Sequence, residues 1–114
     1  MGTLNNKVQL IGNVGETPKI TVLEGGKKVV RFSLATNSYS KNGDGERVQH
    51  AEWHKIVAWG KTAELIAAHA GKGREIALEG KLSSRTYTTS SGESRYITEV
   101  VVKEVLLLGN KTQG

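Results

Sequence analysis

The sequence predicts an all-β fold: a small five-stranded Greek-key barrel with one short helix and extended hairpins. Three observations lead to this prediction, namely runs in which apolar and polar residues alternate, glycine-rich turns between those runs, and one short alanine-rich stretch. Strands joined by single turns, with the helix placed before the last hairpin, are typical of the OB-fold. The alternation alone would fit any small barrel, and the position of the helix favours this one.

Length and composition indicate one globular domain. The chain has 114 residues, of which 37% are hydrophobic and 24% charged. We assign residues 1–109 to the barrel and residues 110–114 to a frayed end. Lysine and arginine outnumber aspartate and glutamate by 16 to 11, and this excess favours a polyanionic partner. The sequence has no cysteine, so no disulfide can form, and this absence does not indicate a compartment. Because a signal-peptide core and a membrane-length apolar run are missing, we expect a cytoplasmic protein without membrane contact.

The first half of the chain is predicted to contain three strands, at residues 4–14, 19–23 and 28–39. Gly12 lies inside the first strand and predicts a bend or bulge there, which a small barrel needs in order to close. Gly25 and Gly26 predict a hairpin between the second and third strands, because glycine accepts positive φ without steric cost. The side chains of the third strand that we expect in the core are Val30, Phe32 and Leu34.

The second half begins with a polar loop at residues 40–46 and a strand at residues 52–61, whose alternation extends upstream to Arg47. A helix is predicted at residues 61–70, anchored by Leu65 and ended by Gly71 or Gly73. Residues 74–87 and 95–108 then form an antiparallel hairpin. The core residues that we expect from its first strand are Ile76, Leu78 and Leu82.

The strand at residues 52–61 carries the strongest functional pattern. Trp53, Lys55 and Trp59 share one face with Arg47, whereas Ile56 and its alternating neighbours form an apolar face. Exposed aromatics interleaved with cations can stack on bases and neutralise phosphates. The alternative is that both tryptophans belong to the core and Lys55 extends past them to solvent. Six residues of strand separate the indoles by about 20 Å, which favours contacts with different bases of one extended strand.

A second strand repeats this pattern, because Lys81, Arg85 and Tyr87 share one face of residues 74–87. Tyr39, beside the polar loop, is a further candidate for stacking on bases. The alternative is that it is an ordinary tyrosine at the end of a strand. Since every base has a π-face but duplex bases already stack on one another, we expect a preference for unpaired strands with little sequence readout.

Catalytic and metal-binding patterns are weak. Gly60-Lys61-Thr62 resembles the end of a phosphate-binding loop, but Lys55 stands where that pattern requires glycine. His50 and His54 share a face, yet four residues of strand place them about 13 Å apart, too far for one metal ion. We therefore expect a protein that is not an enzyme and has no cofactor or metal. The acidic residues expected to form ion pairs are Glu52, Glu79 and Glu99.

Five short motifs follow one another along almost the whole chain, from about Asn6 to Gly109. They are Asn6-Lys7-Val8-x-Leu10-x-Gly12-Asn13-x-Gly15, Phe32-x-Leu34-Ala35-Thr36, Glu52-Trp53-His54-x-x-Val57-x-x-Gly60-Lys61-x-Ala63-Glu64, Lys72-Gly73-x-x-Ile76-x-Leu78-Glu79-Gly80-x-Leu82-x-x-Arg85 and Gly92-x-x-Arg95-Tyr96-x-Thr98-Glu99-Val100. Each motif is moderately specific. In this order, they resemble the bacterial single-stranded DNA-binding protein family.

The resemblance implies an OB-fold, usually assembled as a homotetramer, that binds single-stranded DNA in replication, recombination and repair, near the nucleoid. The aromatics that match the family's stacking positions are Tyr39, Trp53, Trp59 and Tyr87. The cations that match its backbone contacts are Lys7, Lys55, Lys61, Lys72 and Arg85, to which the strand pattern adds Arg47 and Lys81. His54 matches a contact between subunits.

Family members often continue into a long tail with an acidic, apolar tip that recruits replication and repair proteins. This sequence ends at Lys111-Thr112-Gln113-Gly114 without that tail, so we expect DNA binding from these residues and partner recruitment only through a tail that they do not include. Two other functions stay open. A dimeric primosomal restart adaptor would bind DNA weakly, and a cold-shock-like OB protein would prefer single-stranded RNA.

Overall fold

The computed structural model describes residues 5–109. The elements are β1 (Val8–Val14), β2 (Thr21–Val22), a 3₁₀ turn (Glu24–Gly26), β3 (Lys28–Lys41), β4 (Arg47–Trp59), α1 (Gly60–His69), β5 (Glu75–Thr88) and β6 (Ser94–Leu107). The frayed end expected at residues 110–114 and the start of the first predicted strand at Leu4 lie outside the described residues.

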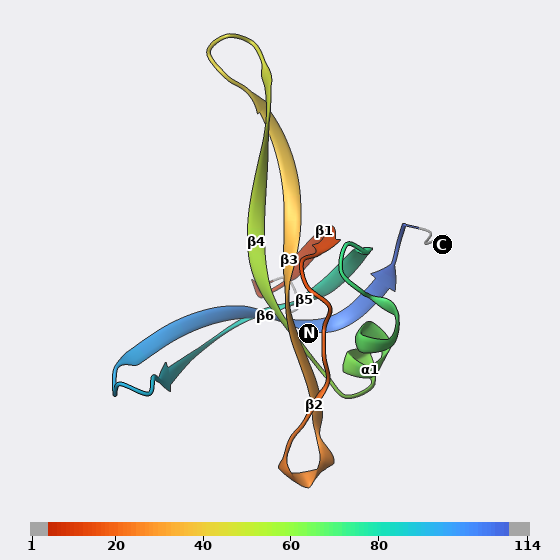
Figure 1. Cartoon of the computed structure of the whole chain (residues 1–114), viewed down its shortest axis with the longest axis vertical. Helices are drawn as coiled ribbons and strands as arrows, with labels where there is room; N and C mark the ends of the chain where they lie inside the picture. The colour runs from red at the N-terminus through yellow and green to blue at the C-terminus, as the bar shows by residue number, and fades with distance from the viewer. Residues whose placement is uncertain (1–4, 110–114) are drawn as a thin grey trace.

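Five of the strands close into a barrel, which confirms the predicted fold class (Figure 1). The strand order is β1-β5-β6-β4-β3, and β1 closes the ring by pairing with β3 as well. All neighbouring pairs are antiparallel except β4 and β6, which run parallel. The two-residue strand β2 pairs with the beginning of β3. The single helix connects β4 to β5, as the sequence predicts.

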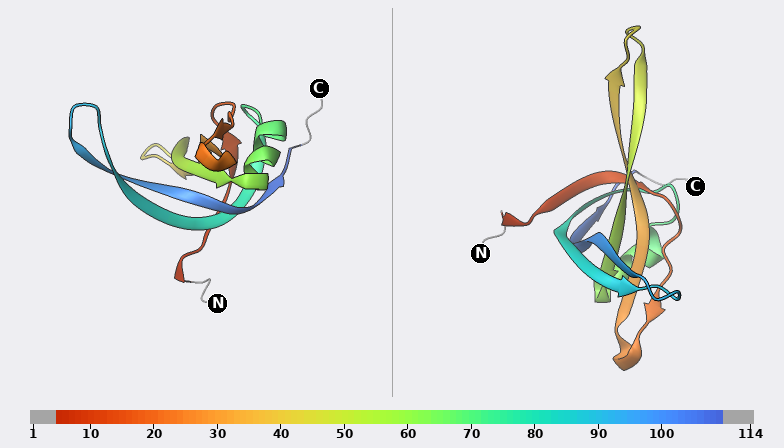
Figure 2. Two further views of the ribbon diagram at one scale, coloured as in Figure 1. Left: turned by 90° about the horizontal axis from the view of Figure 1, so that it is seen from below. Right: turned by 90° about the vertical axis from the view of Figure 1, so that its left-hand side faces the viewer.

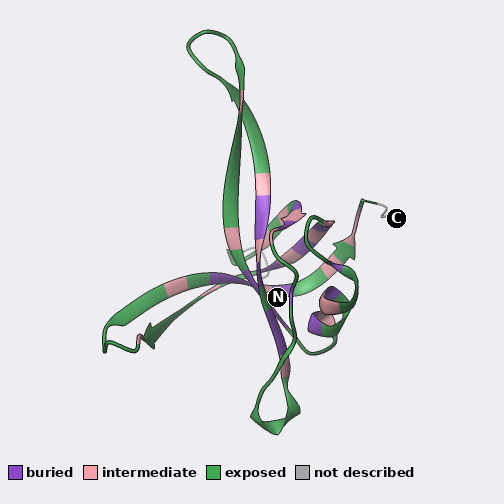
Figure 3. Cartoon of the chain, viewed as in Figure 1, coloured by how far each residue is buried: buried purple, intermediate pink, exposed green. Residues whose placement is uncertain are grey.

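The core confirms most of the expected positions (Figure 3). The buried cluster includes Val30, Phe32 and Leu34 from β3 together with Ile76 and Leu78 from β5. The helix packs onto this cluster through Ala63, Ile66 and Ala70. The prediction that Leu65 anchors the helix is wrong: Leu65 is exposed, because the helix turns its smaller side chains and Ile66 towards the barrel.

Several strand boundaries also differ from the prediction: the second strand is shorter, the third runs to Lys41 into the predicted loop, and the fourth begins at Arg47. The fourth strand ends at Trp59, and Gly60 and Lys61 form the first turn of α1 instead of continuing the strand. Gly60 has a φ of +64°, a value that glycine adopts readily and that redirects the chain from the extended Trp59 into the helix. Lys61 therefore projects from the first turn of the helix, beside the end of β4.

Two long hairpins project from the barrel (Figures 1 and 2). We call residues 37–51 the β3–β4 arm and residues 82–98 the β5–β6 arm, because almost all of these residues are exposed. Leu82 was expected in the core, but it is 51% exposed. It has the alternation of a core residue yet lies beyond the end of the barrel, where β5 has entered the arm.

A glycine marks the place where each arm leaves the barrel. A side chain on Gly12 would overlap the Ala35 carbonyl of β3, and one on Gly80 would overlap the Val101 carbonyl of β6. The pairing of β1 with β5 continues without a shift through Gly12, so the bulge expected there is not found. The register shift lies instead between Glu79 and Gly80. Both glycines allow two backbones to approach more closely than any side chain would permit.

Candidate nucleic-acid interface

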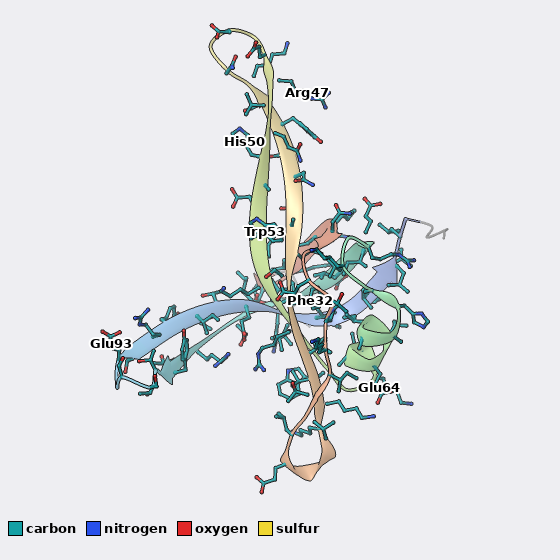
Figure 4. All side chains as sticks on the ribbon, viewed as in Figure 1. Phe32, Arg47, His50, Trp53, Glu64 and Glu93 are labelled. Atoms are coloured by element: carbon teal, nitrogen blue, oxygen red, sulfur yellow. The ribbon has the colours of Figure 1, made fainter. Side chains whose placement is uncertain are left out.

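Strand pairing places the predicted aromatic and basic residues of the β3–β4 hairpin on one face. Trp53 lies opposite Ala35, Lys55 opposite Ser33 and Trp59 opposite Val29. Directly opposite residues of an antiparallel pair point to the same side of the sheet. Because Tyr39 pairs with Gln49 in the same register, it joins this face at its outer end. Figure 4 shows Trp53 near the root of the β3–β4 arm and Arg47 farther along it.

The β5–β6 hairpin continues the same face. Val57 of β4 is aligned with Val101 of β6, and Val101 in turn lies opposite Lys81 of β5. From this point, the alternation along β5 brings Arg85 and Tyr87 to the same side. We call this surface, which spans β3, β4, β6 and β5, the aromatic face.

The aromatic side chains on this face are exposed. Trp53 is 61% and Trp59 40% exposed, and both tyrosines, Tyr39 and Tyr87, are exposed as well. The alternative in which the tryptophans belong to the barrel core is therefore wrong. All seven cations proposed to contact phosphates are exposed too; they are Lys7, Arg47, Lys55, Lys61, Lys72, Lys81 and Arg85.

Trp53 is positioned by a residue without a side chain. A Cβ added to Gly15 would lie 2.5 Å from Cζ3 of the indole, so the ring occupies the space that a side chain would need. Gly15 is held in place because its backbone N–H donates to the Ser33 carbonyl at 2.8 Å. The indole therefore extends across β3, with one part against the protein and the rest open to solvent.

Each arm places an arginine over a tyrosine ring. The guanidinium carbon of Arg47 lies 4.3 Å from the centre of the Tyr39 ring, and that of Arg85 lies 5.7 Å from the centre of the Tyr87 ring. Such cation–π contacts favour a ring that keeps a fixed orientation. They also bring a positive charge next to each surface on which a base could stack.

A buried carboxylate lies in the middle of the aromatic face. Glu99 of β6 is only 7% exposed, and its two oxygens accept hydrogen bonds from Arg85 Nε at 3.3 Å and Nη2 at 3.4 Å. Arg31 of β3 approaches the same carboxylate, with Nε 3.6 Å from Oε2. Glu99 therefore forms the expected ion pair with two partners, Arg85 and Arg31. Glu79 also forms an expected pair, with Lys7 at 3.8 Å.

Arg31 is a further basic residue of this face, and it was not assigned to the site from the sequence. It lies opposite Val57. Val57 points to the exposed face and is nevertheless only 2% exposed. The Arg31 side chain crosses β4 beside it, since Glu99 of β6 lies on the far side of that strand. Its position could have been inferred from the sequence, since Arg31 and Tyr39 share one alternation along the same strand.

A shallow hollow borders Trp59 where β4 passes into α1. It is lined by Lys27, Lys28, Lys61 and Glu64 together with glycines. The Lys28 ammonium donates a hydrogen bond of 2.8 Å to Glu64, and this bond and the lysine's charge lower the pKa of the Glu64 carboxyl. Because Lys28 is engaged in this way, Lys27 and Lys61 carry the positive charge beside the indole.

Some predicted residues lie away from the aromatic face. Lys72 belongs to the loop between α1 and β5, near His69 and Arg74. Lys7 precedes β1 and is held beside Glu79. His54 points to the opposite side of β4 from the tryptophans, is partly buried, and shares a hydrogen bond of 2.9 Å with the Thr36 hydroxyl.

Within residues 5–109, no three histidine, aspartate or glutamate side chains lie close enough together to hold a metal ion. The described helix is too short to cross a membrane.

Comparisons with known proteins give one consistent result. The model of the single-strand binding protein family matches residues 5–108. A single-stranded DNA-binding protein 1 of Chlorobaculum tepidum is 39% identical over 96% of this chain and 68% of its own length. A single-stranded DNA-binding protein 1 of Xylella fastidiosa is 41% identical over 93% of this chain and 79% of its own length. Other relatives extend further, and the chain spans 61% of one from Xanthomonas axonopodis.

Solved structures agree with the fold. A Plasmodium falciparum SSB in complex with ssDNA superposes with a TM-score of 0.81 at 34% identity, covering 91% of this chain and 95% of that chain. A deletion mutant of the single-stranded DNA binding protein from Thermus aquaticus gives a TM-score of 0.78 at 23% identity and covers 93% of this chain and 51% of that one. At this lower identity, the second similarity concerns the fold alone.

Proposed function

Because this chain belongs to the single-strand binding protein family, we propose that it binds single-stranded DNA without sequence preference, by stacking unpaired bases on the aromatic face and neutralising their phosphates. The activity is binding and protection of exposed strands in replication, recombination and repair, without chemical turnover.

The observation that carries this proposal is the exposure of both tryptophans on a face that also presents cations. An indole that is open to solvent at 61% or 40% leaves a hydrophobic surface uncovered, and an unpaired base covers such a surface well. Lys55 lies between the two indoles on β4, and Arg47 and Arg85 accompany the tyrosines. Aromatic rings accompanied by cations suit a DNA strand, because each of its bases is accompanied by one phosphate.

We assign two roles to the side chains. The residues proposed to stack on bases are Tyr39, Trp53, Trp59 and Tyr87. The residues proposed to meet the DNA backbone are Lys7, Arg47, Lys55, Lys61, Lys72, Lys81 and Arg85. Of these, Lys7 and Lys72 lie outside the aromatic face, so they would be reached by DNA that continues beyond it.

The test is a titration with oligo-dT over a range of salt concentrations, with a duplex and an oligo-U of equal length as competitors. We expect oligo-dT to bind more tightly than either competitor. The logarithm of affinity should fall with the logarithm of salt concentration by about 0.7 per phosphate neutralised. Tighter binding of the duplex would contradict stacking, and tighter binding of oligo-U would favour an RNA-binding function.

We further propose that the chain acts as a homotetramer in the bacterial cytoplasm, associated with the nucleoid, with His54 at a contact between subunits. The position of His54 on the side of β4 away from the tryptophans supports this, because subunits could meet there without covering the aromatic face. Sedimentation of the protein alone measures the mass. A tetramer is expected, whereas a dimer with weak DNA binding would favour the restart adaptor. We also propose that replication and repair proteins are recruited through a C-terminal tail of the kind that the family resemblance implies.

A further inference from the structure

The midpoint between the two tryptophans is the place that any DNA strand touching both must cross. Lys55 and Val57 are the two residues of β4 that lie on this face between the indoles, and Arg31 of β3 lies directly opposite Val57. Because Arg31 also reaches Glu99 of β6, its side chain crosses β4 beside Val57. If the proposed function is correct, the backbone of a strand stacked on both indoles passes above the Arg31 guanidinium.

We propose that Arg31 is a further contact for the DNA backbone and that the buried Glu99 is the residue that positions it. Neither residue is among the contacts assigned above. The ligand is a phosphodiester group of the strand that connects the bases stacked on Trp53 and Trp59.

The geometry leaves Arg31 able to bind a phosphate while it contacts Glu99. Its closest approach to the carboxylate is 3.6 Å, from Nε to Oε2, which is longer than a hydrogen bond, and its side chain is 50% exposed. A guanidinium has five N–H donors in a rigid fork, so a half-exposed one beside a single carboxylate keeps donors for a phosphate. Two arginines share one carboxylate here, and the cluster therefore keeps one net positive charge at the centre of the aromatic face.

Glu99 fits a positioning role because of its burial. The Glu99 side chain is 8% exposed, whereas its two arginine partners are about half exposed. A buried carboxylate is costly without partners, so it holds the guanidinium groups above it. The bridge fixes an otherwise flexible arginine across β4 before DNA arrives, which reduces the entropy lost when a phosphate binds.

The first test replaces Arg31 with glutamine and measures oligo-dT affinity against salt concentration. We expect roughly fivefold weaker binding at moderate salt and a salt slope smaller by about 0.7, as for one lost phosphate contact. Lys103→Gln is the matched control: Lys103 is an exposed cation on β6 outside the proposed contacts, and its replacement should leave the slope unchanged. An Arg31→Gln slope equal to that of the unmodified protein would overturn the contact. If the unmodified protein itself failed to bind oligo-dT, the proposed function would fail instead.

The second test compares Glu99→Gln with Glu104→Gln, which remove the same charge from the same strand. Glu104 is exposed, so its loss should leave binding unchanged or strengthen it slightly. Glu99→Gln should weaken binding severalfold despite removing a negative charge, because the arginines lose their support. In the Glu99→Gln background, Arg31→Gln should cause little further loss. Circular dichroism and thermal melting establish that each variant is folded. Stronger binding by folded Glu99→Gln would overturn the positioning role. A third variant, Arg31→Lys, keeps the charge without the fork. Compared with Arg31→Gln, it should regain the full salt slope but only part of the lost affinity.

Discussion

The two arms carry the same pair of side chains, a tyrosine with an arginine near its ring, but they differ in how the arginine is held. In the β5–β6 arm, Arg85 donates two hydrogen bonds to the buried Glu99 and lies 5.7 Å from the Tyr87 ring. In the β3–β4 arm, Arg47 lies closer to its ring, at 4.3 Å, and forms no ion pair with any carboxylate of residues 5–109.

This difference separates two ways of holding a cation on the aromatic face. Arg85 is fixed by the barrel before DNA binds, so its contribution is linked to the stability of the fold. Arg47 is held only by the ring that a base would compete for, so it can move without disturbing the barrel. We therefore expect replacement of Arg85 to affect folding and binding together, and replacement of Arg47 to affect binding alone.

The largest effect is expected where the arms leave the barrel. Gly80→Ala and Gly12→Ala should each lower the free energy of unfolding by about 3 kcal/mol or more, because the new methyl group would overlap a backbone carbonyl that cannot move away. Gly43→Ala, at the open end of the β3–β4 arm, is the control and should change little. Urea denaturation measures all three. A Gly80→Ala protein as stable as the parent would contradict the close approach of β5 and β6 at the base of the β5–β6 arm.

The next effect concerns the two faces of the β5–β6 arm. Tyr87 and Tyr96 are both exposed, but Tyr96 lies opposite Thr86 and therefore on the other side of the hairpin. Tyr87→Ala should weaken oligo-dT binding by about 1–3 kcal/mol, the cost of one lost stack, and Tyr96→Ala should not. Equal losses from both variants would show that DNA does not distinguish the faces.

A smaller effect separates the two arginines. Arg85→Gln should lower the free energy of unfolding by about 1 kcal/mol, because Glu99 keeps only its longer contact with Arg31, while Arg47→Gln should not change it. Both variants should reduce the salt slope of oligo-dT binding by about 0.7. Thermal melting measures the change in stability, and salt titration measures the change in slope. A stability loss in Arg47→Gln would remove the proposed distinction between the arms.

The smallest effect comes from an exposed ion pair outside both arms, which contrasts with buried Glu99. Lys28 lowers the pKa of Glu64 from its ordinary value of 4.5. A lowered carboxyl pKa stabilises the fold above pH 4.5, and this contribution disappears as the pH falls through the lowered value. Lys28→Gln should return the pKa of Glu64 towards 4.5, as NMR titration of the carboxyl carbon would reveal, with little change in stability at neutral pH. A pKa that stays low would assign the shift to another group.

Local alternation was enough to predict the barrel strands and the outward tryptophans. Val30, Phe32 and Leu34 alternate into the core, and Trp53 and Trp59 alternate out of it, since each pattern depends only on neighbours along one strand. The short helix was equally visible, because its composition changes abruptly after Trp59. These features identify the fold and most of the aromatic face.

The remaining features depend on where strands meet, which alternation does not specify. Leu82 has the pattern of a core residue, but only the register shift beside Gly80 and the end of the barrel place it on the exposed arm. The contact between Arg31 and Glu99 requires two successive strand registers, β3 with β4 and β4 with β6. The sequence could assign each of these residues to a face of its strand, but it could not predict that the two side chains contact each other.

The central claim is that both indoles stack on the same bound strand, and tryptophan emission tests it most directly. The chain has two tryptophans, so Trp59→Phe leaves Trp53 as the only emitter and Trp53→Phe leaves Trp59. On addition of oligo-dT, we predict that emission is quenched in both variants and that quenching follows the same binding curve as an independent measure of complex formation. Complex formation with unchanged emission from either indole would contradict the account.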